Sequence, residues 1–142
     1  MKILIINGPN LANLGQREIA IYGSVSFDDY LKTLQINNPL IEIDHFQSNI
    51  EGELIDKLYE ADKQHYDGIV LNAGGYTHTS VALADAVGAI CTKVVEVHIS
   101  SILARESYRH VSLIAPKCIG SIMGFGLGSY SLGIQAIINK SK

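Results

Sequence analysis

A chain of 142 residues with 47% hydrophobic and 18% charged residues is typical of one globular domain with an ordinary core. The net charge is -3 at pH 7, and Lys and Arg are scattered along the chain, which argues against a nucleic-acid partner. The longest apolar runs are too short to cross a bilayer, and residues 1–8 lack the features of a signal peptide. We therefore expect a single domain over residues 1–142, a cytoplasmic location and no membrane segment.

Five short segments carry strand patterns. Residues 2–6 are continuously apolar, as in a parallel strand that is buried on both faces of a sheet. Residues 68–71 and 93–97 repeat this pattern, whereas residues 41–46 alternate apolar and polar side chains, as a strand nearer a sheet edge does. Residues 113–115 are expected to form the last strand.

Apolar residues recur at helical spacing between and after these segments. Ser26 is expected to cap the first helix, and Ser48 with Glu51 forms a capping-box pattern for the second. The alternation of strands and helices predicts an α/β fold, a flavodoxin-like three-layer sandwich with a five-stranded parallel sheet. The expected helices cover residues 27–36, the segment that follows Ser48 and ends near His65, and residues 80–90, 101–108 and 129–139.

Parallel sheets of this kind bind ligands beyond the carboxyl ends of their strands, at the point where the strand order reverses. The segments that follow the predicted strands are rich in amides and imidazoles, at residues 7–10, 47–49, 72–78 and 96–101. We therefore expect a binding or catalytic site at this edge of the sheet.

The stretch of residues 7–23 is interrupted by Gly and Pro, and such a long loop predicts an active-site lid. Arg17 and Tyr22 lie on it. A phenol has a pKa of about 10, so it acts as a base at neutral pH only when a cation such as a guanidinium stabilises the phenolate. The alternative is an exposed Arg stacked on a Tyr ring, which composition alone favours.

Glu96 and His98 alternate along a predicted strand, so their side chains should project to the same side. A carboxylate beside an imidazole favours the imidazolium, which could serve as a general acid. The alternative is a core His held by a structural carboxylate. A metal site formed with His78 is conceivable, but no metal-binding spacing supports it.

Three other features are ambiguous in the sequence. His78 and Asp85 could be a substrate ligand and its helix-borne partner, whereas Arg105 and Arg109 could simply form ion pairs with Glu106 on a helix face. The glycine-rich run at residues 124–128 lies far from the first strand and lacks the spacing of a nucleotide-binding loop.

Taken in order, six blocks of the chain resemble the type II 3-dehydroquinate dehydratases: NGPNL, RExxxYG, QSNIEGELID, NAGGYTHTS, VEVHIS and ESYRH. The resemblance covers nearly the whole chain. It implies a single catalytic domain, a lyase that converts 3-dehydroquinate to 3-dehydroshikimate in the third step of the shikimate pathway. It also implies anti elimination through an enolate, without metal, Schiff base or other cofactor.

The resemblance assigns catalytic roles to matching positions. Tyr22 would accept the proton from the carbon beside the ketone, and Arg17 would stabilise the phenolate. Asn10 would hold the enolate through a water molecule. His98 would donate a proton to the departing hydroxyl, oriented by Glu96.

The resemblance also implies the substrate contacts. Asn72, His78 and Arg109 would hold substrate hydroxyls, and the backbone N–H groups of Ile99 and Ser100 would bind the carboxylate. A second set of implications concerns assembly: Asp85 would reach in from a neighbouring subunit, because the family forms trimers arranged into a dodecamer. The role of Arg105 is left open.

The lid departs from the family pattern at three positions. Ala12 and Asn13 precede Leu14 where Asn-Leu-Leu is expected, and Ile19 stands where Pro is common. Replacing Pro by Ile releases a fixed backbone angle, so we expect a lid that is partly mobile without ligand.

The competing hypothesis is a non-enzymatic flavodoxin-like module that binds a nucleotide, a flavin or a partner protein, since this fold hosts many functions. Two features oppose it. No phosphate-binding fingerprint follows the first strand, and the polar residues gather at the ends of different strands, as in a catalytic site.

Overall fold

Five parallel strands form one sheet in the computed structural model, which describes residues 1–16, 20 and 24–141. Their order is β2-β1-β3-β4-β5, and every neighbouring pair is parallel. This order is flavodoxin-like and confirms the predicted fold class, with the strand order reversing between β1 and β3. The strands are β1 (Lys2–Asn7), β2 (Glu42–Gln47), β3 (Gly68–Asn72), β4 (Val94–His98) and β5 (Gly120–Met123).

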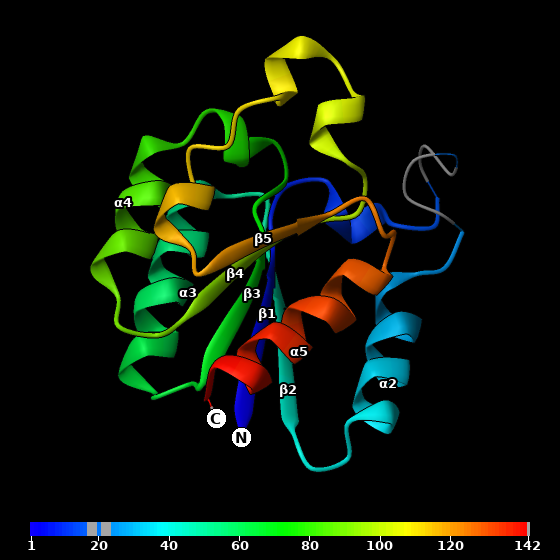
Figure 1. Cartoon of the computed structure of the whole chain (residues 1–142), viewed down its shortest axis with the longest axis vertical. Coiled ribbons are helices and arrows are strands. Elements are labelled where there is room, and N and C mark those ends of the chain that lie inside the picture. Colours follow the sequence, from blue (N-terminus) through cyan, green and yellow to red (C-terminus); the bar gives the residue numbers. More distant parts are fainter. Residues whose placement is uncertain (17–19, 21–23, 142) are drawn as a thin grey trace.

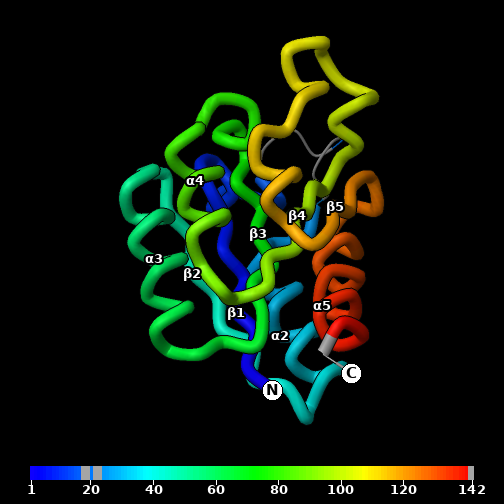
Figure 2. Tube along the Cα trace, turned by 60° about the vertical axis from the view of Figure 1, so that its left-hand side comes forward, coloured from blue at the N-terminus to red at the C-terminus, as the bar shows by residue number. Residues whose placement is uncertain are grey.

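Helices cover both faces of the sheet and complete the three predicted layers (Figure 1). Helices α3 (Glu51–Lys63) and α4 (Val81–Ala89) lie on one face, and α2 (Phe27–Asn37) and α5 (Gly128–Ser141) on the other. Figure 2 shows the same division after rotation, with the beginning of β1 and the end of α5 both at the amino-terminal edge of the sheet. Among the residues that the structure describes, no helix has the length and apolar character needed to cross a membrane.

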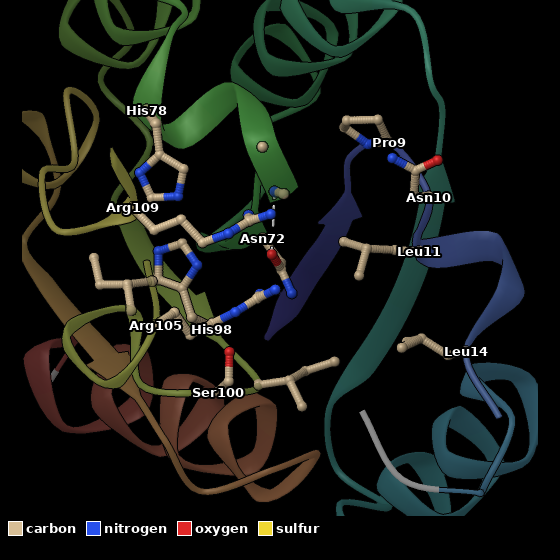
Figure 3. A pocket seen from close by; sticks show the side chains of 14 residues that line it. Pro9, Asn10, Leu11, Leu14, Asn72, His78, His98, Ser100, Arg105 and Arg109 are labelled. Atoms are coloured by element: carbon tan, nitrogen blue, oxygen red, sulfur yellow. Dashed lines mark hydrogen bonds between the residues drawn. The ribbon is translucent and has the colours of Figure 1, made fainter. Parts of the chain in front are cut away.

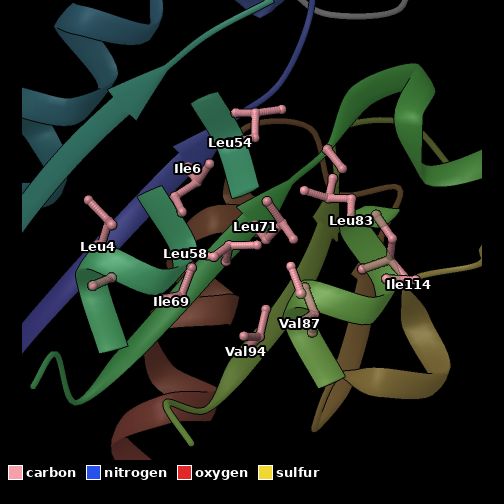
Figure 4. Close-up of a cluster of buried hydrophobic side chains, with 14 of the residues drawn as sticks. Leu4, Ile6, Leu54, Leu58, Ile69, Leu71, Leu83, Val87, Val94 and Ile114 are labelled. Carbon is pink, nitrogen blue, oxygen red and sulfur yellow. The ribbon is translucent and has the colours of Figure 1, made fainter. Parts of the chain in front are cut away.

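Side-chain alternation along β1 divides the core into two clusters. Leu4 and Ile6 face α3 and α4, where they pack with Leu58 and Leu71 in the cluster of Figure 4. Ile3 and Ile5 point the opposite way, into a cluster under α2 and α5. All four β1 side chains are almost completely buried, as expected for a central parallel strand.

The structure confirms one predicted helix cap and contradicts the other. Ser26 accepts a hydrogen bond from the backbone N–H of Asp29 at 3.2 Å. The capping box at Ser48 is wrong, because α3 begins at Glu51 with Ile50 as its N-cap. Ser48 instead accepts a bond from the Ile50 N–H and donates one to a carboxylate in the first turn.

Two predicted elements after β4 are also wrong. Residues 101–108 do not form one helix but two 3₁₀ turns, η3 (Ile102–Ala104) and η4 (Ser107–Arg109), separated by extended backbone. Residues 113–115 do not form a strand, and the last strand is β5. The Ser112 hydroxyl accepts the N–H groups of the two residues that follow Leu113, at 3.2 and 2.9 Å, so these groups are not available to a sheet.

Candidate active site

The carboxyl ends of β1, β3 and β4 meet beneath η3 and η4, which lie across this edge of the sheet (Figure 1). A pocket of about 140 Å³ opens here, at the predicted switch point. Among the described residues, those that line it include no acidic side chain. They are Pro9, Asn10, Leu11, Leu14, Asn72, Gly74, Gly75, His78, His98, Ile99, Ser100, Ile102, Arg105 and Arg109.

Figure 3 shows that this pocket has two unlike walls. The two imidazoles and the two guanidiniums lie on one side, with Asn72 in the middle. The side chains on the other side are Pro9, Asn10, Leu11 and Leu14. The arrangement offers hydrogen bonds and positive charge from one side and mainly apolar contact from the other. Such a pocket suits a small, polar anion.

His98 ends β4 and is backed by a buried carboxylate. Its Nε2 lies 3.4 Å from Oε1 of Glu96, which confirms that the two side chains share one side of the strand. Glu96 is completely buried, and its two oxygens accept hydrogen bonds of 2.6 Å from the hydroxyls of Ser112 and Ser121. These contacts fix the carboxylate in one position.

The charge state of Glu96 follows from the same contacts. Burial by itself raises the pKa of the carboxyl, but the adjacent imidazole of His98, with the hydroxyls of Ser112 and Ser121, more than offsets it. The pKa of Glu96 therefore lies below its ordinary value. At neutral pH the group is therefore an anion beside the imidazole of His98.

His78 ends the 3₁₀ turn η2 (Gly74–His78) and points into the pocket (Figure 3). Its Nδ1 lies 2.7 Å from the backbone carbonyl of Val111. A carbonyl only accepts, so Nδ1 carries a proton in this bond. Nε2 then remains as the atom that meets a ligand.

Two arginines share one carboxylate at the rim. Glu106 accepts a hydrogen bond of 3.0 Å from Nε of Arg109, and Nε of Arg105 lies 3.6 Å from the same oxygen. The predicted ion pairs are therefore present, but between residues at the ends of the turns η3 and η4 instead of on one helix face. Glu106 orients both guanidiniums, which still carry more positive charge than it neutralises.

The beginning of the predicted lid, residues 8–10, is held close to the sheet. Gly8 packs so tightly that an added Cβ would lie 2.5 Å from the carbonyl oxygen of Ala73. Asn10 has left-handed backbone, with φ of 69°, and its N–H bonds to Asn49 at 3.0 Å. Asn adopts this backbone more readily than most residues other than glycine.

The structure brings most of the predicted site residues together and leaves others untested. Asp85 is exposed on α4 and does not line the pocket of its own chain. Arg17, Tyr22 and Ile19 lie outside the described residues, so their predicted roles stay predictions. Those that line the pocket are Asn10, Asn72, His78, His98, Ile99, Ser100 and Arg109, with Glu96 directly behind His98.

Sequence reasoning missed two kinds of residue: apolar side chains that line the pocket and hydroxyls that hold Glu96. Leu11 and Ile102 contribute apolar lining, and Ser112 and Ser121 hold Glu96. The only signal for the two serines would have been the need of a buried carboxylate for hydrogen-bond donors. That need does not say which hydroxyls supply them.

Two alternatives find no support in the geometry. In the described part of the chain, no group of three or more His, Cys, Asp or Glu side chains could hold a metal ion. The glycine-rich run does not offer its N–H groups to a phosphate, because Gly124 and Gly126 donate theirs to the carbonyls of His98 and Ile99, at 3.3 and 2.9 Å. The run ties the loop before α5 to the end of β4.

A flavodoxin-like sheet with a cationic pocket and a carboxylate-backed imidazole at its switch point defines an α/β enzyme, not a nucleotide-binding module. Comparison with known proteins gives the family. Residues 1–138 match the dehydroquinase class II family, and the chain belongs to it.

The sequences of related proteins match this chain over almost its full length. The chain is 52% identical over 139 residues to a 3-dehydroquinate dehydratase of Exiguobacterium sp., covering 97% of this chain and 94% of the relative. It is 50% identical over 142 residues to one of Fusobacterium nucleatum, covering 97% of each. The crystal structure of a type II dehydroquinase from Butyrivibrio crossotus is 44% identical, covers 97% of each chain and superposes with a TM-score of 0.94.

Proposed function

We propose that this enzyme is a lyase that dehydrates 3-dehydroquinate to 3-dehydroshikimate, in the third step of the shikimate pathway and of aromatic amino-acid biosynthesis. Family membership supports the overall reaction. The observation that carries the chemistry is the pairing of His98 with the buried anion Glu96 at the floor of a cationic pocket. The substrate has the matching character, a small ring with a carboxylate, hydroxyls and a ketone.

The proposed mechanism is an anti elimination in two stages. A base removes a proton from the carbon beside the ketone, and the electron pair of that C–H bond moves into an enolate. The enolate then collapses: a carbon–carbon double bond forms, the C–O bond to the leaving hydroxyl breaks, and an acid protonates that oxygen so that it departs as water. A general acid and a general base account for all proton movements, so the proposal requires no metal, Schiff base or cofactor.

His98 is the proposed general acid. Its Nε2 faces Glu96, so Nδ1 is the nitrogen that we assign to the leaving hydroxyl. Glu96 is proposed to keep the ring oriented before the transfer, and it remains ionised throughout. Water can return the proton after the product leaves.

Tyr22 is the proposed base, with Arg17 holding its phenolate. Resemblance of the RExxxYG block to the family supports this assignment. Asn10 is proposed to hold the enolate through a water molecule, and its position on the pocket wall opposite His98 supports that role (Figure 3). An acid and a base on opposite sides of the ring are what anti elimination requires.

The proposed substrate contacts come from polar groups that line the pocket. The backbone N–H groups of Ile99 and Ser100 are proposed to bind the carboxylate, just beyond the end of β4. Asn72, His78 and Arg109 are proposed to hold ring hydroxyls. Their convergence from β3, η2 and η4 supports a ligand with several polar groups around one ring.

The family resemblance also supports a proposed assembly of trimers into a dodecamer, in which Asp85 serves the pocket of a neighbouring subunit. The exposure of Asp85 on α4, away from its own pocket, is consistent with that role. The cytoplasmic location stays a prediction.

A subunit-mixing experiment tests the role of Asp85. Asp85→Ala and His98→Asn subunits are each expected to be nearly inactive alone. Unfolded, mixed and refolded together, they should regain activity, because a pocket with intact His98 then meets an intact Asp85 from its neighbour. A monomer in light scattering, or no recovery in a mixture that assembles, would remove Asp85 from the site.

A dehydration assay without metal tests the proposed function. Protein treated with a chelator is expected to convert 3-dehydroquinate to a conjugated enone, followed by its near-ultraviolet absorption, at the same rate as untreated protein. The His98→Asn variant, purified identically, measures contaminating activity. Loss of activity with the chelator and its return with a divalent ion would contradict the proposed mechanism.

A further inference from the structure

Three buried polar side chains from separate elements meet beneath the pocket. Asn7 ends β1 and Asn72 ends β3, and the two are direct partners in the strand register. Tyr130, in the first turn of α5, joins them from the helix layer. Asn7 and Tyr130 are completely buried, and Asn72 is 3% exposed. Only Asn72 has a role in the proposed reaction.

The orientation of the Asn72 amide follows from one backbone group. The N–H of Gly74 donates to Oδ1 of Asn72 at 3.2 Å, and a backbone N–H can only donate. Oδ1 must therefore face Gly74. Nδ2 then faces the hydroxyl of Tyr130 at 2.8 Å and donates to it.

The remaining bonds continue in the same direction. Because the Tyr130 oxygen accepts from Asn72, its proton is directed to Oδ1 of Asn7, at 2.7 Å. Nδ2 of Asn7 then faces Nε2 of His45 at 3.1 Å and requires an unprotonated nitrogen there. Burial lowers the pKa of His45, which favours that neutral ring.

We propose that Tyr130 is a positioning residue, whose hydroxyl holds the Asn72 amide in place against the substrate, in the orientation that the Gly74 N–H selects. The role rests on the proposed function, because Asn72 is the residue that meets the substrate. With Nδ2 bonded to Tyr130 and Oδ1 to Gly74, Asn72 presents its second N–H to the pocket as a donor. A reversed amide would place N–H against the N–H of Gly74, so two orientations are not equally available.

The hydroxyl can be removed with little change in packing. Tyr130→Phe keeps the ring that packs edge-on against Phe27, with centroids 5.0 Å apart. It leaves Asn7 and Asn72 each without one buried hydrogen-bond partner. The amide of Asn72 is then held only by the N–H of Gly74, so its Nδ2 is no longer fixed in position.

A double-mutant cycle tests this proposal. Tyr130→Phe is expected to lower kcat/KM about tenfold, the effect of losing one well-placed hydrogen bond. In an Asn72→Ala background the same change should lower it by less than about twofold, because Tyr130 acts through Asn72. Tyr66→Phe is the matched control, since it removes a hydroxyl that donates to Asp44 at 2.5 Å, remote from the pocket, and should leave kcat/KM unchanged.

Equal losses from Tyr130→Phe in both backgrounds would overturn the proposal, as would full activity of the single variant. A second measurement does not depend on substrate or on any variant folding. In wild-type protein, NMR should show cross-relaxation between the Asn72 Nδ2 protons and the Tyr130 ring, and slow exchange of those protons with water. If the Asn72 Nδ2 protons exchange at the rate of a solvent-exposed amide, the positioning role is overturned even if the enzyme dehydrates 3-dehydroquinate. If these protons are protected but the enzyme does not dehydrate the substrate, only the proposed function is contradicted.

Discussion

His98→Asn is expected to lower kcat by roughly 10²–10⁴-fold while the protein keeps its fold and binds 3-dehydroquinate. Asn is close in size and polar but cannot carry a transferable proton at neutral pH. The loss should fall on kcat, because the hydroxyl must be protonated as it leaves, whereas binding relies on other side chains. Steady-state kinetics and calorimetric titration of the variant with substrate separate the two effects.

Glu96→Gln is the companion variant. It preserves the shape of the side chain and can still meet the hydroxyls of Ser112 and Ser121, but it removes the negative charge beside His98. We expect a smaller loss in kcat than for His98→Asn. The double variant should lose little more than His98→Asn alone, because Glu96 acts through His98.

His65→Asn provides a control with the same chemical change. His65 is exposed, lies after α3 and has a φ of 56°, a backbone angle that Asn accepts readily. Its kinetics should match the wild type. A His98→Asn enzyme that keeps kcat within about threefold of the wild type, far less than removal of a general acid costs, would remove His98 from its role.

Tyr22→Phe is expected to abolish nearly all turnover, with a loss in kcat of at least about 10³-fold. Phe has the same ring but no oxygen that could take the proton from carbon. The two catalytic variants should differ in one partial reaction. Exchange of the substrate proton with deuterated solvent, followed by mass spectrometry, should survive in His98→Asn and disappear in Tyr22→Phe.

Tyr59→Phe is the matched control for this variant, because Tyr59 is exposed on α3 and distant from the pocket. Its kinetics should be those of the wild type. Proton exchange that persists at the wild-type rate in Tyr22→Phe would assign the base to another residue. The expected mobility of the lid, attributed to Ala12, Asn13 and Ile19, stays a prediction.

The sheet and its helices were largely predictable because they follow short-range patterns. Continuous apolar runs indicated β1, β3 and β4, and the two-residue spacing placed Glu96 and His98 on one side of a strand. The segment after β4 was not predictable in this way. Residues 101–115 contain helix- and strand-like patterns, but there the chain must cross the pocket and contact His78 and Glu96.

Tyr130 shows the same limit inside a correctly predicted helix. Its position in the apolar pattern predicted that the ring faces inward, and it does. The pattern contained no information on the hydroxyl, whose partners Asn7 and Asn72 lie 123 and 58 residues away. Hydrogen-bond partners at such separations depend on strand order and register, which local periodicity does not encode.

The sequence by itself determined the layered α/β fold, the edge of the sheet that carries the site and, through its ordered blocks, the family. Only the tertiary structure decided how the site is held: the hydroxyls on Glu96, the tautomer of His78, the shared carboxylate of the two arginines and the direction of the Asn72 amide. Burial and periodicity determine which face of a helix is buried, because they depend on residues only three or four positions apart. The direction of a buried hydrogen bond depends on which groups distant segments bring within about 3 Å.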